Sequence, residues 1–266
     1  DTYPLLATST LPESWPTDPQ LGSFWPGWYA EILQEGSAGG VDQTAGTATV
    51  GTFISDEDVY MEFDDRWAHR GNPTTLGSNY YHMGYPMGIK VRAMAHSYGI
   101  AYAEDVVFIT IKVRNESGAF YDEKNVWHPA MTMPDGSVLN GGKGFNYRNA
   151  YLGFYFDVDA FSAQADGDLG GRSNNDDMMG FDPYYRFAYI YDLDGVSSST
   201  YTDLAYTSIK LLDTPLSSSY LDTDGDGDYD IEPGDSLGMS DWHYFSWYAR
   251  PGVVSMEDDN SSCYAG

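Results

Sequence analysis

Apolar and polar residues alternate with a period of two along much of the chain, which is the pattern of strands with one buried face. The alternation is clearest at 89–98 and 105–114, and the short link between these segments favours an antiparallel pair. In the second segment, the residues predicted to point inward are Val107, Ile109, Ile111 and Val113. The full set of predicted strands is 47–54, 58–64, 89–98, 105–114, 151–159, 185–192, 203–212 and 242–249.

The connections between these segments are rich in Gly, Asp, Asn, Ser and Pro, and no long segment has a helical period. We therefore expect an all-β fold, a two-sheet antiparallel β-sandwich of the jelly-roll or immunoglobulin-like type with long Gly/Asp-rich loops. No convincing linker divides the chain, so residues 31–266 are expected to form a single β-sandwich domain.

Residues 1–30 differ from the rest because prolines and large aromatic residues are interleaved there. Prolines at this density disfavour regular helix and central strand. We predict an extended N-terminal arm whose aromatic side chains dock either on the chain's own core or on a neighbouring subunit. One short helix is expected at 27–35, where Trp28 and Ile32 share a face and Gly36 occupies the C-cap position.

The chain is strongly acidic. Its 266 residues include 13 Lys and Arg against 40 Asp and Glu, for a formal net charge of −27. Hydrophobic residues make up 42%, which is too many for a disordered acidic chain. A surface of this charge repels phosphate, so nucleic acid and anionic lipid are poor partners and metal cations are the natural counter-ions. No stretch approaches the length of apolar sequence that a membrane span needs.

The single cysteine, Cys263, rules out a disulfide framework within the chain. The first residue is Asp1, which indicates either a secreted chain whose signal peptide has been removed or a fragment. The acidic, Tyr- and Gly-rich and Lys-poor composition fits a secreted protein better than a cytosolic enzyme. We therefore expect an extracellular or cell-surface location.

The most specific motif is the acidic stretch DTDGDGDYDIEPGD at 222–235. Gly225 and Gly227 permit the positive φ angles that let the backbone curl around a point. Clustered carboxylates repel one another unless a cation lies among them, and Ca²⁺ takes about six to eight oxygen ligands in a flexible geometry. The predicted metal ligands are Asp222, Asp224, Asp226, Asp228, Asp230, Glu232 and Asp235.

This stretch resembles the calcium loop of EF-hands, a type that dockerins and thrombospondin type-3 repeats also use. The residues that match the loop are Asp222, Asp224, Asp226, Gly227 and Asp230, with Asp228 placed to bind through its backbone carbonyl. The last ligand position, a carboxylate in the family, is Pro233, so Glu232 or Asp235 would have to substitute. The resemblance implies Ca²⁺ as a cofactor, without the helix pair of a regulatory switch.

A second acidic group is spread over 157–194. Asp157 and Asp159 end one apolar strand on the same side, and Asp192 and Asp194 end another in a similar way. If these strands are neighbours, their acidic ends meet at one edge and form a second metal site; the alternative is an exposed polar loop. The candidate ligands are Asp157, Asp159, Asp176, Asp177, Asp192 and Asp194.

Sequence motifs for zinc binding, nucleophilic catalysis, phosphate loops and dinucleotide binding are absent. The best-placed carboxylates for glycoside hydrolysis are Glu62, Asp64 and Asp65, close to Trp67, although chance proximity is the better explanation among 40 acids. The many tyrosines and tryptophans would suit a carbohydrate-stacking platform, or they fill the core and subunit contacts.

Three segments, 85–117, 151–159 and 237–253, resemble a broad group of uncharacterised, secreted β-sandwich proteins from environmental bacteria. Members of that group often carry further β-domains and a C-terminal sorting segment for export to the cell surface. The resemblance implies a fold and a location, and no catalytic motif accompanies it.

Together these observations indicate a non-enzymatic, extracellular module that is stabilised by calcium and acts in surface structure or adhesion. Assembly into a filament or sheath is an extension of this hypothesis, with further copies or other cell-surface proteins as partners. The alternative is a carbohydrate-binding module or a jelly-roll glycoside hydrolase, with glycans as ligands.

Overall fold

The structure, a computed structural model, is all-β in the part of the chain that it describes. The described residues are 5–18, 22–28, 40–42, 47–49, 51–66, 86–122, 125, 127–148, 150, 152–155, 177–182, 184–192, 206–223, 225–239, 243–244 and 264–265. Their strands pair antiparallel, and the helical segments among them are 3-10 turns at Pro12–Ser14, Pro26–Trp28 and Leu139–Gly142. The predicted all-β class is confirmed, and the finer two-sheet sandwich stays a prediction. No described helix is long and apolar enough to cross a membrane.

The chain divides into two compact units, Asp1–Tyr151 and Leu152–Gly266. The sequence predicted a different division, with an arm over 1–30 and a single domain over 31–266. The arm belongs to the first unit because its strand and its tryptophans pack on that unit's main sheet.

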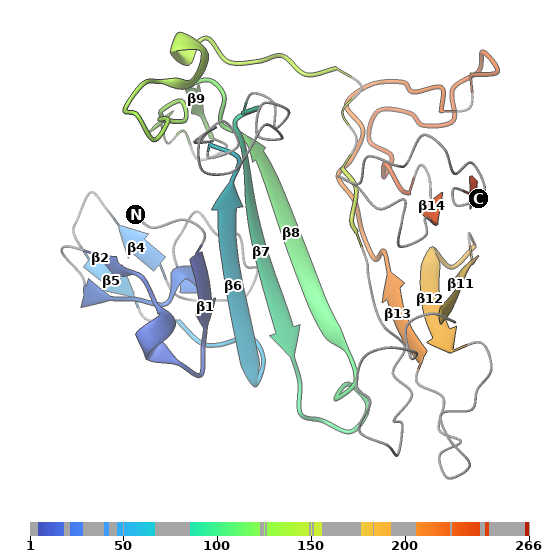
Figure 1. Cartoon of the computed structure of the whole chain (residues 1–266), viewed down its shortest axis with the longest axis horizontal. Helices are drawn as coiled ribbons and strands as arrows, with labels where there is room; N and C mark the ends of the chain where they lie inside the picture. The colour runs from blue at the N-terminus through green and yellow to red at the C-terminus, as the bar shows by residue number, and fades with distance from the viewer. Residues whose placement is uncertain are drawn as a thin grey trace, which may run out of the picture. The chain divides into compact units, whose positions relative to one another are not determined.

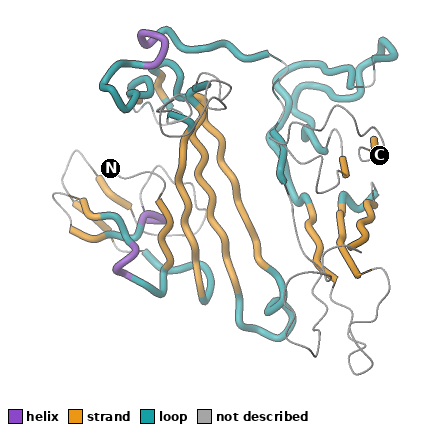
Figure 2. Tube along the Cα trace, viewed as in Figure 1, coloured by secondary structure: helices purple, strands orange, loops and turns teal. Residues whose placement is uncertain are grey.

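The first unit is built on a four-stranded sheet in the order β1-β6-β7-β8 (Figures 1 and 2). The strands are β1 (Leu5–Thr8), β6 (Glu57–Asp64), β7 (Ile89–Ser97) and β8 (Val107–Asn115). The β7–β8 pair runs over its full length, from Ile89 opposite Asn115 to Ser97 opposite Val107. This confirms the antiparallel pair that the alternating pattern predicted.

Aromatic residues of the arm cover one face of this sheet. Phe24, Trp25 and Trp28 form a buried cluster with Tyr60 of β6 and Met94 of β7, which lie directly opposite each other in the sheet. Trp25 is only 1% exposed, and the Phe24 and Trp28 rings meet edge to face at 5.4 Å. Of the two docking surfaces considered for the arm, the chain's own sheet is the one observed for these residues.

The opposite face of the sheet is apolar and exposed. Val107, Ile109, Ile111 and Val113 are 39–57% exposed, so the prediction that they point inward is wrong. Leu6, Met61 and Phe63 share this face by their register and are also exposed. The physical reason is that alternation defines two faces of a strand, whereas the arm, a distant part of the chain, decides which of them it covers.

Short two-stranded pairs complete the described strands. In the first unit, β2 (Thr17–Asp18) pairs with β3 (Gly22–Ser23), β4 (Gly40–Asp42) with β5 (Thr47–Thr49), and β9 (Phe120–Tyr121) with β10 (Trp127–His128). In the second unit, β14 (His243–Tyr244) pairs with β15 (Tyr264–Ala265).

The second unit contains a three-stranded sheet in the order β11-β12-β13. The strands are β11 (Asp177–Asp182), β12 (Phe187–Asp192) and β13 (Tyr206–Lys210). Ala188 and Ile190 on the central strand are buried, whereas Tyr189 between them belongs to the other face. β12 and β13 therefore have the half-buried alternation from which they were predicted, whereas β11 was not among the predicted strands.

Most of the predicted strands contain a strand of the structure, and one of them is much shorter than expected. Among the described residues of 47–54, only Thr47–Thr49 is a strand. Within 242–249, His243–Tyr244 is a strand, and the other residues lie outside the described part of the chain. At 151–159 the described residues, 152–155, form no strand, and the remainder lies outside the described part of the chain. Residues 29–35 of the predicted short helix also lie outside it.

The aromatic cover of the sheet yields a stability prediction. Trp25→Ala should lower the free energy of unfolding by about 3–5 kcal/mol, because it empties a site at the centre of the buried cluster. Trp127→Ala, a control at a tryptophan that is 54% exposed, should cost under about 1 kcal/mol. Urea unfolding followed by circular dichroism measures both, and equal costs would contradict the assigned core.

Candidate functional site

The acidic stretch 222–235 lies at the end of a hairpin-like pairing in the second unit. Leu221 and Ile231 form a β-bridge, in which the Leu221 N–H donates to the Ile231 carbonyl at 3.0 Å. A second bridge joins Leu216 to Ser236. Backbone pairing therefore holds the two ends of the loop together.

The backbone of the loop curls at its two glycines, as the sequence predicted. The φ angles of Gly225 and Gly227 are 80° and 101°, a region that residues with a Cβ atom rarely adopt. The carboxylate of Asp222 accepts both glycine N–H groups, at 2.6 Å and 3.1 Å. Asp222 thus lies on the inner side of the curl, where the first ligand of a calcium loop would lie.

Two further carboxylates of the loop also bind its own chain. Asp226 accepts the N–H of Asp228 at 3.0 Å. Asp230 accepts the N–H and the hydroxyl of Thr223, at 2.8 Å and 2.7 Å. These contacts use some of the lone pairs of each carboxylate and fix its position at the loop.

The complete ligand set of this loop stays a prediction. Asp235 accepts the N–H of Glu232 at 3.0 Å, so these two acids lie close to each other at the end of the loop. Asp224 lies outside the described residues. Among the residues that are described, no three Asp, Glu, His or Cys side chains are grouped so that they could hold a metal ion.

The second acidic group is described only in part. Asp177 and Asp192 lie directly opposite each other in the β11–β12 pair, so two of its members share one edge of that sheet. Their side chains are not described, and neither are the other four candidates, Asp157, Asp159, Asp176 and Asp194. A second metal site therefore also stays a prediction.

The first unit contains a buried ion cluster centred on Glu62 of β6, which is 6% exposed. One carboxylate oxygen lies 2.6 Å from Lys90 Nζ, and the other lies 2.7 Å from Arg92 Nε. The Tyr60 hydroxyl donates a third contact at 2.5 Å. One carboxylate thus pairs with two cations from the neighbouring strand.

These surroundings decide the ionisation of Glu62. Burial alone would raise its pKa, but the Arg92 charge and the hydrogen bonds from Lys90 and Tyr60 outweigh burial and lower the pKa to about 2. A general acid for glycoside hydrolysis must carry a proton near neutral pH. Glu62 is ionised there and is held by ion pairs, which argues against that role.

The two other carboxylates considered for hydrolysis have structural partners. Both oxygens of Asp64 accept from Arg66 Nε at 2.9 Å. The Asp65 carboxylate accepts the backbone N–H groups of residues 87–89, at 2.6–3.1 Å. The aromatic residue and the histidine at 67 and 69 lie outside the described part of the chain. The described contacts thus assign Asp64 to fixing Arg66 just after β6, and Asp65 to holding the backbone where β7 begins.

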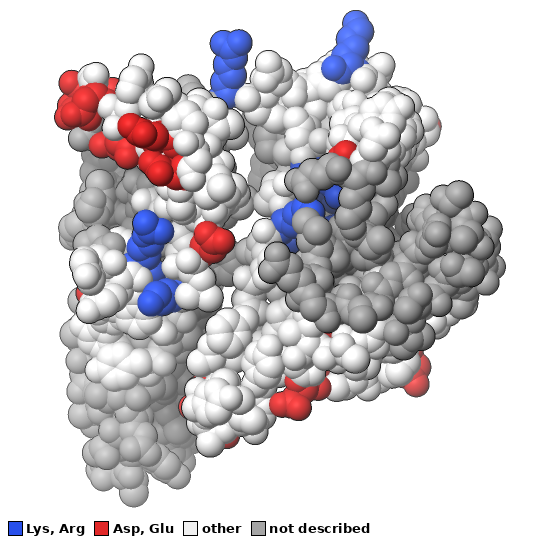
Figure 3. Space-filling model, turned by 180° about the vertical axis from the view of Figure 1, so that it is seen from behind, with Lys and Arg blue, Asp and Glu red and all other residues white. Residues whose placement is uncertain are grey.

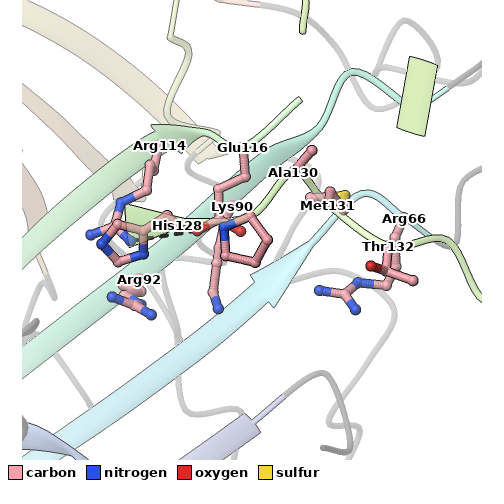
Figure 4. Close-up of a pocket in the computed structure, with 10 residues that line it drawn as sticks. Arg66, Lys90, Arg92, Arg114, Glu116, His128, Ala130, Met131 and Thr132 are labelled. Carbon is pink, nitrogen blue, oxygen red and sulfur yellow. Dashed lines mark ion pairs between the residues drawn. The ribbon is translucent and has the colours of Figure 1, made fainter. Parts of the chain in front are cut away.

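A pocket of about 250 Å³ opens beside the ion cluster, and basic side chains dominate its charged lining. Its lining residues are Arg66, Lys90, Arg92, Arg114, Glu116, His128, Pro129, Ala130, Met131 and Thr132. Figure 4 shows Arg114, Arg92 and His128 toward one end and Arg66 with Thr132 toward the other. We call this the basic pocket. On the face drawn in Figure 3, by contrast, the described Lys and Arg side chains form small, separate groups.

Sequence reasoning missed the basic pocket because net charge was considered for the whole chain. The signal was present as alternating bases on two adjacent predicted strands, at 90 and 92 and at 112 and 114. Alternation places both members of each pair on one face, and pairing of the strands brings the two pairs together.

A row of aromatic rings lies on the outer face of the second unit's sheet. We call it the aromatic strip; it consists of Phe187, Tyr189, Tyr191 and Tyr206. Successive ring centroids are 5.6–6.0 Å apart, with interplanar angles of 23–30°. The Tyr189 ring lies over Gly180 of β11, so closely that a Cβ there would overlap the ring. The rings are therefore roughly parallel, and one of them lies against the sheet.

The depressed pKa of Glu62 predicts how stability depends on pH. A carboxyl whose pKa is lower in the folded state stabilises the protein fully above its ordinary pKa of 4.5, and this stabilisation is lost as the pH falls toward 2. Glu62→Gln should cost about 3 kcal/mol at pH 7 and much less near pH 2. Urea unfolding at several pH values measures this, with the exposed Glu104→Gln as the control. A pH-independent difference between wild type and Glu62→Gln would contradict the ion cluster.

No protein-family model, no curated protein and no solved structure matches this chain. Function is therefore inferred from the residues themselves. Three features are available for that purpose: the curled acidic loop, the aromatic strip and the basic pocket.

Proposed function

We propose that the chain is an extracellular structural or adhesion module whose 222–235 loop binds Ca²⁺ and is stabilised by it. The observation that carries the proposal is the curl at Asp222, whose carboxylate accepts the N–H groups of Gly225 and Gly227. In the calcium loops that this stretch resembles, a curl of this kind lets alternate carboxylates reach a common centre, and Ca²⁺ tolerates the irregular oxygen geometry that results.

The charge of the whole chain adds a reason for a bound cation. At a net charge of −27, repulsion among carboxylates opposes the compact state, and a divalent cation at the densest acidic segment reduces it. An ion that binds the folded chain more tightly than the unfolded chain also stabilises it by mass action. Extracellular location belongs to the same proposal and is supported by the composition.

Self-association into a filament or sheath extends this proposal. It is supported by β8, which is an edge strand of its sheet and has exposed apolar residues on one face. Edge strands and exposed apolar patches are the surfaces through which β-proteins commonly associate. The partners in this proposal are further copies of the chain or other cell-surface proteins.

The aromatic strip favours carbohydrate binding as a second candidate function. Sugar rings stack on flat aromatic surfaces, and the strip presents nearly parallel rings in a row, with Tyr206 at one end 62% exposed. Lys210 and Ser208 are exposed on the same face of β13 and supply polar groups for sugar hydroxyls. A binding module fits these features better than a hydrolase, since Glu62 lacks the environment of a catalytic acid.

Calcium should raise the melting temperature of the full chain by about 5–10 °C over EGTA when its concentration is about 100 times Kd, since that saturation is worth about 2.7 kcal/mol. Asp222→Asn should abolish most of the shift, because asparagine loses the charge and keeps one of the two oxygens that accept the glycine N–H groups. Asp105→Asn, a control at an exposed acid outside the loop, should keep it. Differential scanning calorimetry measures all three.

A direct binding measurement covers the case in which Asp222→Asn perturbs the loop. Tyr220 and Tyr229, 5.1 Å apart at the loop, are placed to sensitise emission from Tb³⁺ bound there. We expect tyrosine-excited Tb³⁺ emission that added Ca²⁺ reverses. Absence of this emission, together with identical melting curves in Ca²⁺ and EGTA, would refute the proposal.

If the aromatic strip binds glycans, the protein should be retarded in native gels that contain a suitable soluble polysaccharide. Tyr206→Ala should weaken that binding about tenfold, roughly 1.4 kcal/mol, because it removes the most exposed ring of the strip. Tyr102→Ala, at a tyrosine that is 87% exposed in the other unit, serves as the control. Equal retardation of both variants would exclude the strip, and no retardation across a broad panel would exclude the function.

A further inference from the structure

The bases of the β7–β8 pair are arranged at a cost in stability. Lys90 lies directly opposite Arg114, and Arg92 lies directly opposite Lys112. Like charges in directly opposed positions of an antiparallel pair destabilise it. The chain has 40 acidic residues and only 13 basic ones, so two neighbouring pairs of opposed bases stand out against its composition.

The third strand brings acids to the same region. On β6, Glu62 lies opposite Arg92 and Asp64 lies opposite Lys90. At these positions of the three strands, bases therefore outnumber acids. Both ion pairs of Glu62 go to β7, and Arg114 on β8 lies 3.5 Å from Glu116.

Contacts beneath the basic pocket hold its donors in place. The Arg114 guanidinium lies over the Phe120 ring, 5.6 Å from its centroid, and His128 stacks on the same ring at 4.9 Å. His128 also lies 3.0 Å from Asp122. Lys90, on β7, is held by burial, since only 7% of its surface is exposed. Donors that are already positioned lose little freedom when a ligand binds, which favours affinity.

The remainder of the lining defines the ligand further. Glu116 supplies an acceptor and Thr132 a hydroxyl, while Pro129, Ala130 and Met131 supply apolar surface. A simple inorganic anion has neither a hydrogen-bond donor for the Glu116 carboxylate nor apolar surface to pack against the wall. A small ligand with an oxyanion, several hydroxyl groups and apolar C–H faces uses all of them, and about 250 Å³ accommodates a ligand of monosaccharide size.

We propose that the basic pocket binds an acidic sugar through a carboxylate or sulfate group. The Arg114 guanidinium and the Lys90 and Arg92 side chains hold the oxyanion. A planar guanidinium donates two parallel N–H hydrogen bonds to two oxygens of one carboxylate or sulfate group. Glu116 and Thr132 bind hydroxyl groups of the same sugar. This site is separate in sequence and in chemistry from the acidic loop and the aromatic strip.

Isothermal titration of the full chain at low ionic strength tests the proposal. The probes are glucuronate, galactose 6-sulfate, glucose and inorganic sulfate. We expect one or both acidic sugars to bind, glucose to give no signal, and sulfate to bind at least tenfold more weakly than the acidic sugar. Which acidic sugar binds distinguishes a carboxylate from a sulfate ester as the natural group.

Arg114→Gln should weaken the binding of the acidic sugar about tenfold, which corresponds to roughly 1.4 kcal/mol. Arg114→Lys keeps the charge and loses the paired N–H donors of the guanidinium, so it should weaken binding by an intermediate amount. This variant also covers the case in which Arg114→Gln folds poorly. Lys143→Gln makes the same change of charge at an exposed base outside the pocket and should bind as wild type does.

Four results would overturn the proposal: no binding of either acidic sugar, equal binding of glucose, equal binding of inorganic sulfate, or unchanged binding by Arg114→Gln. A synthetic peptide of residues 222–235 is an additional probe. If that peptide binds in the pocket and the sugars do not, the occupant is an acidic protein segment and the sugar proposal is wrong.

Discussion

The first unit depends on a single carboxylate that is shared by two cations. Glu62 lies within 2.7 Å of both Lys90 and Arg92, and without it two bases on β7 would be buried beside further bases on β8. Buried charges are tolerated when they are paired and hydrogen-bonded, and here three donors converge on one acceptor. This cluster allows the charged face of the sheet to be the covered one.

The covered face is organised around that constraint. At its centre, Tyr60 and Met94 pack under the arm's tryptophans. Toward its other end, Asp58, 1% exposed, pairs with His96 at 2.8 Å. The face thus has an aromatic centre between the Glu62 ion cluster and the Asp58–His96 contact, and the basic pocket opens where the arm's aromatic cover gives way to charged residues. The apolar face of the same sheet is left exposed.

The sequence predicted local features well and long-range ones poorly. The alternation at 89–98 and 105–114 sufficed for two strands, their antiparallel pairing and the sharing of a face by Lys90 and Arg92. It could not reveal which face the arm covers, since that depends on residues more than thirty positions away. The inward placement of Ile109 and Ile111 was wrong for this reason. The curl at the loop glycines was predictable because a φ requirement is local.

The shared carboxylate also bears on how the sequence can change over evolution. Replacing Glu62 alone leaves Lys90 and Arg92 without their shared counter-ion, whereas replacing all three with apolar residues of similar volume is tolerated energetically. Neutral drift by a single step is therefore blocked at Glu62 for as long as the two cations remain. Across related chains the three residues should be inherited as a set, with the charges retained together or lost together.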